Sequence, residues 1–507
     1  MAGRKNSNGK KLNSQQSVNS AIKSICDIMR RSNCAGALQY VPELTWILFL
    51  RILDETEMKE AEHATAVAAD FTPSLASPYR WQDWAAPEGA KRRVLQDSTI
   101  GAFFGFVNND LIPALKALKD RPNATARQKV ISEIFSGVER TRIDTERNLL
   151  DVLDKVNELS NENIDSTHVF ALSQVYEGLL LKMGEKGNDG GQFFTPREVI
   201  RAMVRAIDPK PGESIYDPCC GTGGFLAQAY EYIKNNLGDS STADNLETLK
   251  RGTFYGREKE NLVYPIALAN LVLHGIDQPN LWHGNTLTGG ETYGGLFLDA
   301  PGAYDVILTN PPFGGKEGKE ARTNFEYQTG ATQVLFLQHV IKNLKPGGRC
   351  GIVMDEGVLF RTNETAFVQT KRKLLDDCEL WCIVSLPSGV FTQAGAGVKT
   401  NLLFFTKGKQ TKKVWYYDLS DIKVNKNNPL TINKFEELFR LLPDRASSDH
   451  SWTISREEIE AKGFDLKAVN PNAKSNEDTR TPKELLDLIE AKGKEVAEAM
   501  ATLRRAL

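Results

Sequence analysis

In the segment ESIYDPCCGTGGFLAQAYEYIKNN (residues 213–236), the sequence predicts a short strand, a glycine turn and a helix that follow one another directly. Strands and helices continue to alternate after it, an order typical of a parallel sheet covered by helices on both faces. We therefore predict an α/β fold with a doubly wound, Rossmann-like sheet of seven strands. Its later strands are expected at RGTFYG, LWHGN, YDVILTN, GRCGIVMD, WCIVSLP and KTNLLFF.

The chain has a different character on either side of this sheet. Residues 1–185 show helical spacing of apolar residues and no strand alternation, which predicts an all-helical N-terminal domain. The sheet domain is expected over 186–410, followed over 411–478 by a polar extension with one aromatic strand, VWYYD. The last segment, 479–507, is predicted to be a separate helix.

That last helix carries two signals. Thr481 and Glu484 have the spacing of a capping box, which marks a helix start. Apolar residues then recur on three- and four-residue steps, a short heptad pattern that predicts a partner helix. Packing of this helix on its own domain remains the alternative. The heptad residues are Leu486, Ile489, Val496, Met500, Leu503 and Leu507.

Composition narrows the function. At roughly 100–200 residues per domain, 507 residues predict two to four domains. Lys and Arg number 63 against 65 for Asp and Glu, so nucleic-acid contact is expected to be local or shared with a partner. Seven cysteines without paired CxxC motifs predict neither a disulfide scaffold nor a metal site. No signal peptide or membrane-length apolar run is evident, so we expect a cytoplasmic protein.

Asp217 and the glycine turn after it predict a ligand site. Glycines at 221, 223 and 224 let backbone N–H groups approach a ligand closely, and the helix start adds a positive dipole. A carboxylate at the carboxyl edge of a sheet suits a cationic ammonium group better than a phosphate. Glu258, after the second strand, is placed for two ribose hydroxyls, with a solvated charge as the alternative.

Asn310-Pro311-Pro312-Phe313 follows the apolar strand YDVILT. The Asn310 side-chain oxygen and the Pro311 carbonyl are two acceptors held by adjacent prolines, which suits a planar exocyclic amine. Such acceptors make the amine lone pair more available for attack on a methyl sulfonium. Phe313 offers a face on which a base can stack once it has left a duplex. The alternative is a rigid turn that only ends the strand.

A further helix start precedes the glycine turn. Thr195-Pro196-Arg197-Glu198 has capping-box spacing with proline at the first helical position, so Thr195 is expected to cap a helix that continues through VIRAMVRAI, residues 199–207. The preceding GEKGNDGG, residues 184–191, is predicted to be a flexible glycine-rich loop.

NPPF and DPCCGTGGF, preceded by QFFTPRE, together resemble the amino-methylating DNA methyltransferases of the adenine type. More closely, the chain resembles the modification (methylation) subunit of type I restriction–modification systems. The resemblance covers the helical N-terminal domain, the sheet and the heptad helix. It implies a site-specific DNA adenine methyltransferase that transfers a methyl group from S-adenosylmethionine to the N-6 position of a flipped-out adenine.

The resemblance also implies roles for individual residues. Cys219 and Cys220 are interpreted as packing residues, because transfer to an exocyclic nitrogen needs no covalent intermediate. Asn310, Pro311, Pro312 and Phe313 would hold and activate the base. The cofactor would contact Gln192, Phe193, Phe194, Thr195, Pro196 and Arg197 at its methionine end, Asp217, Gly221, Thr222, Gly223 and Gly224 along its amino-acid moiety, Glu258 at the ribose and Asn285 at the adenine.

The family further implies partners: double-stranded DNA, a specificity subunit with two methylation subunits around it, and a restriction/translocase subunit. The chain has no Walker A sequence, so ATP hydrolysis is expected elsewhere. The helix at 481–507 is expected to dock on the specificity subunit. Two other functions remain open at this point: a methyltransferase acting on RNA or on a protein glutamine, and a non-catalytic scaffold that binds the cofactor.

Overall fold

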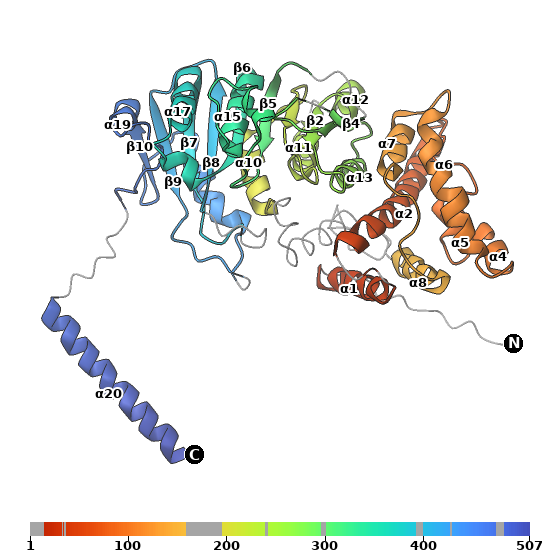
Figure 1. Ribbon diagram of the computed structural model, residues 1–507, viewed down its shortest axis with the longest axis horizontal. Coiled ribbons are helices and arrows are strands. Elements are labelled where there is room, and N and C mark those ends of the chain that lie inside the picture. Colours follow the sequence, from red (N-terminus) through yellow and green to blue (C-terminus); the bar gives the residue numbers. More distant parts are fainter. Residues whose placement is uncertain are drawn as a thin grey trace.

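The structure is a computed structural model, and Figure 1 shows its three parts: N-terminal helices, an α/β body and the helix α20, which stands apart from both. Among the described helices, none is both long and apolar enough to cross a lipid bilayer. The described residues are 15–32, 34, 37–158, 195–238, 242–289, 291–295, 301–391, 399–425, 428–472 and 481–506.

The N-terminal part is helical, as predicted. Its longest helix, α2 (Ala37–Ala66), buries Trp46 and Phe49 completely among the neighbouring helices. A π-helical turn, η1 (Val107–Leu111), and a 3-10 turn, η2 (Ala117–Asp120), extend the helices next to them. The other helices are α1 (Gln15–Arg31), α3 (Trp81–Trp84), α4 (Ala90–Gln96), α5 (Ala102–Phe106), α6 (Ile112–Lys116), α7 (Ala126–Phe135) and α8 (Glu146–Asn157).

The body is built on one ten-stranded sheet, in the order β10-β9-β7-β8-β6-β5-β1-β2-β3-β4. Neighbours from β6 through β5, β1 and β2 to β3 run parallel, whereas β4, β8 and β10 are antiparallel to their neighbours. The strands are β1 (Ile215–Asp217), β2 (Phe254–Glu258), β3 (Asn280–Gly284), β4 (Glu291–Gly295), β5 (Tyr304–Thr309), β6 (Leu344–Asp355), β7 (Cys378–Ser385), β8 (Thr400–Lys407), β9 (Lys413–Asp418) and β10 (Ser451–Ser455).

Helices cover both faces of this sheet. Val306 and Leu308 of β5 pack into one core cluster and Ile307 into another, because successive strand residues point to opposite faces. Helices α10, α11 and α13 lie on the first face, and α15 and α17 lie on the second. The helices of the body are α10 (Arg197–Ile207), α11 (Gly224–Asn235), α12 (Ala243–Arg251), α13 (Tyr264–His274), α14 (Lys319–Arg322), α15 (Thr332–Asn343), α16 (Glu356–Phe360), α17 (Thr365–Asp377), the 3-10 turn η7 (Ile432–Phe435), α18 (Glu436–Leu441) and α19 (Arg456–Ala461).

All seven predicted strands are present, but the expected strand number was wrong because three more join the sheet. β4 reads ETYGG and has no apolar run that would have marked it as a strand. β9 contains the predicted aromatic strand VWYYD, yet it pairs with β7 inside the sheet. β10 then pairs with β9 at the edge, so the sheet continues beyond residue 410.

The order of the strands decides where a ligand binds. β1 lies between β2 and β5, and the chain leaves β1 toward β2 and later returns on the other side at β5. In open α/β sheets, ligands bind outside the carboxyl ends of the strands at such a switch point. Asp217 and Glu258 end β1 and β2, and Asn310 directly follows β5, so all three lie at this edge.

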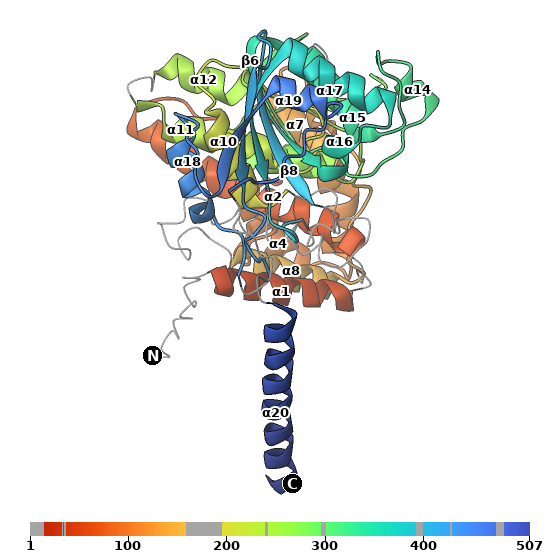
Figure 2. The same ribbon diagram turned by 90° about the vertical axis from the view of Figure 1, so that its left-hand side faces the viewer.

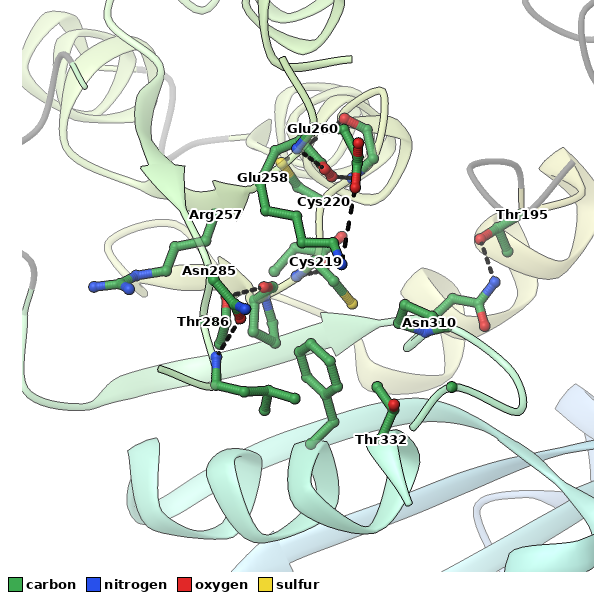
Figure 3. A pocket seen from close by; sticks show the side chains of 18 of the residues that line it. Thr195, Cys219, Cys220, Arg257, Glu258, Glu260, Asn285, Thr286, Asn310 and Thr332 are labelled. Atoms are coloured by element: carbon green, nitrogen blue, oxygen red, sulfur yellow. Dashed lines mark hydrogen bonds and ion pairs between the residues drawn. The ribbon is translucent and has the colours of Figure 1, made fainter. Parts of the chain in front are cut away.

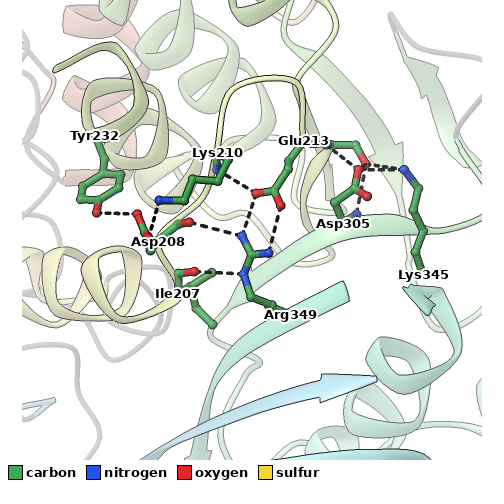
Figure 4. Close-up of polar contacts among 9 residues, drawn as sticks. Ile207, Asp208, Lys210, Glu213, Tyr232, Asp305, Lys345 and Arg349 are labelled. Atoms are coloured by element: carbon green, nitrogen blue, oxygen red, sulfur yellow. Dashed lines mark hydrogen bonds and ion pairs between the residues drawn. The ribbon is translucent and has the colours of Figure 1, made fainter. Parts of the chain in front are cut away.

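A polar cluster holds the opposite, amino edge of the sheet together (Figure 4). The Arg349 guanidinium donates to both Glu213 oxygens, over 2.9 and 2.7 Å, and its Nε donates to the Ile207 carbonyl at the end of α10. Asp305 at the start of β5 accepts from the Ser214 backbone N–H and from Lys345 Nζ. These bonds fix the starts of β1, β5 and β6, and therefore the relative heights at which the strands reach the carboxyl edge.

Candidate active site

A cavity of about 320 Å³ opens at the carboxyl edge, a volume within the range of small-molecule sites. Figure 3 shows Asn285 at one end of this cavity and Asn310 at the other, with Glu258 and Cys219 between them. Of the predicted site residues, Pro196, Arg197, Gly223 and Pro311 are not part of the lining, and Gln192, Phe193 and Phe194 lie outside the described residues. The lining contains Thr195, Asp217, Gly221, Thr222, Gly224, Glu258, Asn285, Asn310, Pro312 and Phe313.

Asp217 is buried, with 1% of its surface exposed. Its Oδ1 accepts hydrogen bonds from Thr309 Oγ1, at 2.7 Å, and from the Cys219 backbone N–H, at 3.2 Å. Burial, together with the nearby negative charge of Glu258, raises the pKa of Asp217 to about 7. Since both hydrogen bonds end on Oδ1, Oδ2 is left for a ligand.

Glu258 closes the same side of the cavity. It is 6% exposed, so it is not the solvated charge of the alternative interpretation. Its two oxygens accept from the backbone N–H groups of Gly221 and Glu260, each at 2.9 Å. Burial outweighs these bonds and raises the pKa of Glu258 to about 7. Glu258 therefore fixes the glycine turn while its carboxylate faces the cavity.

The turn at 221–224 requires glycine at positions 221 and 223. Gly221 and Gly223 have φ angles of 53° and 80°, which L-residues rarely adopt. A Cβ on Gly223 would also come within 3.1 Å of Leu271 Cγ on α13. The carbonyl of Thr222 accepts from Asn270 Nδ2 of the same helix, at 2.8 Å. The turn is thus held rigidly at the start of α11.

Asn310 has a fixed side-chain orientation. Its Nδ2 donates to Thr195 Oγ1 at 2.9 Å, across the mouth of the cavity (Figure 3). Its Oδ1 is covered from solvent and has no hydrogen-bond partner among the described residues. A buried acceptor without a partner is costly, and such atoms are rare in folded proteins. Oδ1 is therefore a buried acceptor whose hydrogen-bonding capacity is unused among the described residues.

The role of Thr195 differs from the one predicted. The capping-box prediction was wrong, because Pro196 is the N-cap of α10 and no side chain caps this helix. The hydroxyl that would have served as the cap accepts the Asn310 amide instead. Glu198 accepts from Arg201 and from the Ile432 backbone N–H rather than closing a capping box.

The remaining NPPF residues are also supported from outside the motif. The carbonyl of Pro311 accepts from Gln333 Nε2, on α15, at 3.3 Å. The Phe313 ring meets the ring of Phe391 edge to face, with centroids 5.4 Å apart and planes at 83°. Phe313 lines the cavity, so its ring is available there as an apolar surface.

Asn285 lies at the far end of the cavity, after β3. Its Oδ1 accepts from the Leu287 backbone N–H at 3.0 Å, which closes a local turn. Next to it, Thr286 Oγ1 donates to the carbonyl of Pro218, so this turn is tied to the glycine turn. The amide nitrogen of Asn285 makes neither of these bonds and is the donor that the turn presents.

Cys219 and Cys220 behave as packing residues. Burial raises the pKa of both thiols well above its ordinary value, with the charges of Asp217 and Glu258 acting in the same direction. Cys219 Sγ lies 3.0 Å from Thr309 Oγ1, within the bond network of Asp217. Protonated thiols of this kind are poor nucleophiles.

Three residues that hold the site residues in place were not predicted in that role from the sequence. Thr309 bonds to Asp217, Gln333 to Pro311, and Thr195 to Asn310. Thr309 ends an apolar strand and gave no separate signal. Gln333 did carry a sequence signal, because it is a polar residue in TQVLFLQHVIKN, a helix in which most positions are apolar and buried. The contact between Thr195 and Asn310 joins residues 115 positions apart, which no local pattern reveals.

Comparison with known proteins agrees with this geometry. The family model N-6 DNA Methylase matches residues 167–480, and the model HsdM N-terminal domain matches residues 18–156. The chain is 35% identical to the EcoEI type I restriction enzyme methylase subunit of Escherichia coli, over 96% of this chain and 97% of that protein. It is 31% identical to the EcoKI methylase subunit of Escherichia coli K12, over 86% of this chain and 79% of that one.

Solved structures give the same result. A modification subunit of a type I restriction enzyme from Vibrio vulnificus YJ016 superposes with a TM-score of 0.78 at 33% identity, covering 91% of this chain and 98% of that one. A chain solved in work on complex assembly and conformational transition of the type I R-M system gives 0.72 at 36% identity, covering 97% and 98%. The chain therefore belongs to the N-6 DNA methylase family, among the methylase subunits of type I restriction enzymes.

Proposed function

We propose that this chain methylates the exocyclic N-6 of an adenine held out of the DNA duplex by Asn310, Pro311 and Phe313. The observation that carries the proposal is the buried Asn310 Oδ1, which lacks a hydrogen-bond partner among the described residues. With the carbonyl of Pro311, whose neighbours Asn310 and Pro312 line the cavity, it would provide two acceptors for the two N–H bonds of an aromatic amine. The cavity continues from them to Asp217 and Glu258.

The other end of the cavity suits S-adenosylmethionine. Two buried carboxylates line it, and neither forms an ion pair with a described side chain. Buried carboxylates of this kind call for a cationic or hydroxyl-bearing ligand. We assign Asp217 and the 221–224 turn to the amino-acid moiety, Glu258 to the ribose and Asn285 to the adenine. S-adenosylmethionine, when bound, supplies a methyl group on a positively charged sulfur.

The residues of the chain orient and activate the target amine. Asn310 Oδ1 and the Pro311 carbonyl accept its two N–H bonds and leave the nitrogen lone pair directed toward the methyl donor. As the new nitrogen–carbon bond forms, the methyl–sulfur bond of the donor would break with its electron pair left on the sulfur, so that the positive charge passes to the nitrogen. The nitrogen then gives up one of its two protons to water through the oxygen that accepts that N–H, Asn310 Oδ1 or the Pro311 carbonyl, so no covalent enzyme intermediate is needed. Phe313 stacks on the base and replaces part of the stacking lost from the duplex.

Helix α20 (Pro482–Ala506) supports the assignment of a protein partner. Its start is the predicted capping box, with Thr481 and Glu484 exchanging backbone and side-chain hydrogen bonds. Both views show the helix projecting from the body (Figure 2). Leu486, Ile489, Val496 and Met500 are between 51% and 66% exposed, an apolar seam without a described partner. We assign this seam to a helix of a specificity subunit that holds two methylation subunits.

Other partners follow from the family. Sequence choice would belong to the specificity subunit, and DNA cleavage with ATP-driven movement to a restriction/translocase subunit. The near-zero net charge of −2 fits a chain that shares its DNA contact with a partner. Under this assignment the chain by itself positions the methyl donor and the base.

Labelled methyl transfer by the complex of this chain with its specificity subunit tests the proposal. We expect label on adenine N-6 in unmethylated and hemimethylated duplexes that carry the recognised site, and none on duplexes without it. RNA of the same sequence and glutamine-containing peptides serve as alternative substrates. Label on RNA or peptide but not on DNA would contradict the proposal, as would a complex that binds the cofactor and labels none of them.

A further inference from the structure

Gln333 is a buried polar residue that contacts the NPPF motif. It comes from the face of the sheet that α15 covers, opposite to the face covered by α10, α11 and α13. It belongs to α15 and is 3% exposed. Its Nε2 donates to the carbonyl of Pro311 at 3.3 Å, and its Oε1 accepts from the backbone N–H of Asp355 at 3.0 Å. One side chain thus joins the segment that follows β5 to the end of β6.

The direction of this amide is determined by its partners. The backbone N–H of Asp355 can only donate, so it must face the oxygen of Gln333. The carbonyl of Pro311 can only accept, so it must face the nitrogen. A flipped amide would place a donor against a donor and an acceptor against an acceptor in a buried site, which is costly. Gln333 therefore always presents a donor to Pro311.

The Gln333 amide N–H restricts the direction in which the Pro311 carbonyl can point. The pyrrolidine rings fix φ at Pro311 and Pro312, and a residue before proline is restricted as well. The direction of the carbonyl still changes with rotation about the Cα–C bond of Pro311. A carbonyl oxygen has two lone pairs. Gln333 takes one, which leaves the other for an incoming N–H bond.

Asn310 is held in the same way as Pro311, by a hydrogen bond to a side chain outside the NPPF motif. There, Thr195 takes the amide nitrogen and leaves Oδ1 as the open acceptor. Each of the two acceptors is thus held by a side chain from outside the motif, on α15 in one case and just before α10 in the other. Two rigidly placed acceptors stabilise the reacting amine more than mobile ones, because no reorganisation is needed during the reaction.

We propose that Gln333 is a positioning residue for methyl transfer, which sets the direction of the Pro311 carbonyl toward the target amine. This proposal rests on the proposed function, in which that carbonyl accepts one of the two N–H bonds. It assigns Gln333 no contact with the cofactor or the base. Loss of its donor is therefore expected to lower kcat while cofactor binding stays unchanged.

The variant Gln333→Glu separates the two bonds of this side chain. A glutamate keeps the acceptor for Asp355 and, when ionised, turns a carboxylate oxygen toward the Pro311 carbonyl. Gln338 provides a matched control on the same helix, since it is 6% exposed and its hydrogen bonds within the described part of the chain are to the backbone N–H and carbonyl of Tyr327, each at 3.0 Å. Gln338→Glu adds the same charge to the same helix without touching Pro311.

We expect kcat of the Gln333→Glu complex with the specificity subunit to fall by about 10–100-fold, as for other supporting residues around a reactive group. The dissociation constant for S-adenosylmethionine should stay within about twofold of the wild type. Burial raises the pKa of a carboxyl group, and its protonated form donates an O–H bond. The ratio of the Gln333→Glu kcat to the wild-type kcat should therefore rise toward one as pH falls. For Gln333→Leu, which has no group to protonate, this ratio should not change with pH.

Several results would overturn the proposal: wild-type kcat in Gln333→Glu, a pH-independent ratio, or an equal loss of kcat in Gln338→Glu. If Gln333→Glu fails to fold by circular dichroism, Gln333→Leu and Gln338→Leu replace the pair, and a kcat loss confined to the former supports the proposal. An equal loss in both would overturn it. Failure of the proposed function would appear separately, as absence of methyl transfer to DNA by the wild-type complex.

Discussion

Asn310 and Thr195 form a hydrogen bond of 2.9 Å that joins the end of β5 to the start of α10. The bond fixes which end of the Asn310 amide faces the cavity. Without it, the amide could turn and present its NH₂ group, which would repel a target amine. The contact therefore couples the helix start before the glycine turn to the residue that binds the base.

Replacing Thr195 by valine removes this acceptor and keeps the shape of the side chain. We expect kcat to fall by about tenfold or more, because the Asn310 amide is no longer held in one orientation. Thr195→Ser keeps the hydroxyl and should stay close to wild type. Single-turnover methyl transfer measures the difference. Equal rates for the valine and serine variants would show that the bond has no role in transfer.

Cofactor affinity should depend on pH through the buried carboxylates. The pKa values of Asp217 and Glu258 are each about 7 in the absence of a ligand, so both groups lose protons as pH rises through that value. The charged carboxylate attracts a cationic ligand, so affinity for S-adenosylmethionine should increase about tenfold from about pH 6 to about pH 8. Asp217→Asn should weaken binding and flatten this dependence. Calorimetric titration at several pH values checks both, and an affinity that falls with pH would contradict the prediction.

The apolar seam of α20 should hold the specificity subunit. Ile489→Glu places a charge in the seam, and Lys494→Glu, which introduces the same side chain on the exposed face away from the seam, serves as control. We expect the first variant, or deletion of residues 481–507, to abolish co-elution with the specificity subunit on size exclusion. Cofactor binding should persist, because α20 stands apart from the body (Figure 1). A complex that survives the deletion would show that the docking surface lies elsewhere.

Arg349 should contribute to stability rather than to chemistry. Its side chain and that of Glu213 are 27% and 21% exposed. Loss of Arg349 leaves the Ile207 carbonyl without this donor and leaves the Glu213 carboxylate, among the described residues, with the Lys210 backbone N–H alone. We expect Arg349→Ala to lower the free energy of unfolding by about 2–4 kcal/mol. Lys210→Ala, whose side chain is 59% exposed, should change it by less than about 1 kcal/mol. Urea unfolding measures both values, and equal effects would contradict this account of the amino edge.

The sequence predicted best where one local pattern decided the outcome. Apolar runs such as YDVILT located the central strands, and the order of strand ends placed Asp217, Glu258 and Asn310 at one edge. β4 was missed because ETYGG has no apolar run, and β10 because SWTIS has only two apolar residues among five. Thr195 was misassigned because the same hydroxyl suits a helix cap and a distant amide, and only the tertiary structure decides between them.

We propose that Asn310 acts on the base and not on the cofactor. The most direct test measures methyl transfer and S-adenosylmethionine binding side by side in Asn310→Ala, within the complex that contains the specificity subunit. We predict a loss of at least about 10³-fold in kcat with a cofactor dissociation constant within about threefold of wild type. Transfer that stays within tenfold of wild type would contradict the account, as would a loss of cofactor binding large enough to explain the loss of transfer.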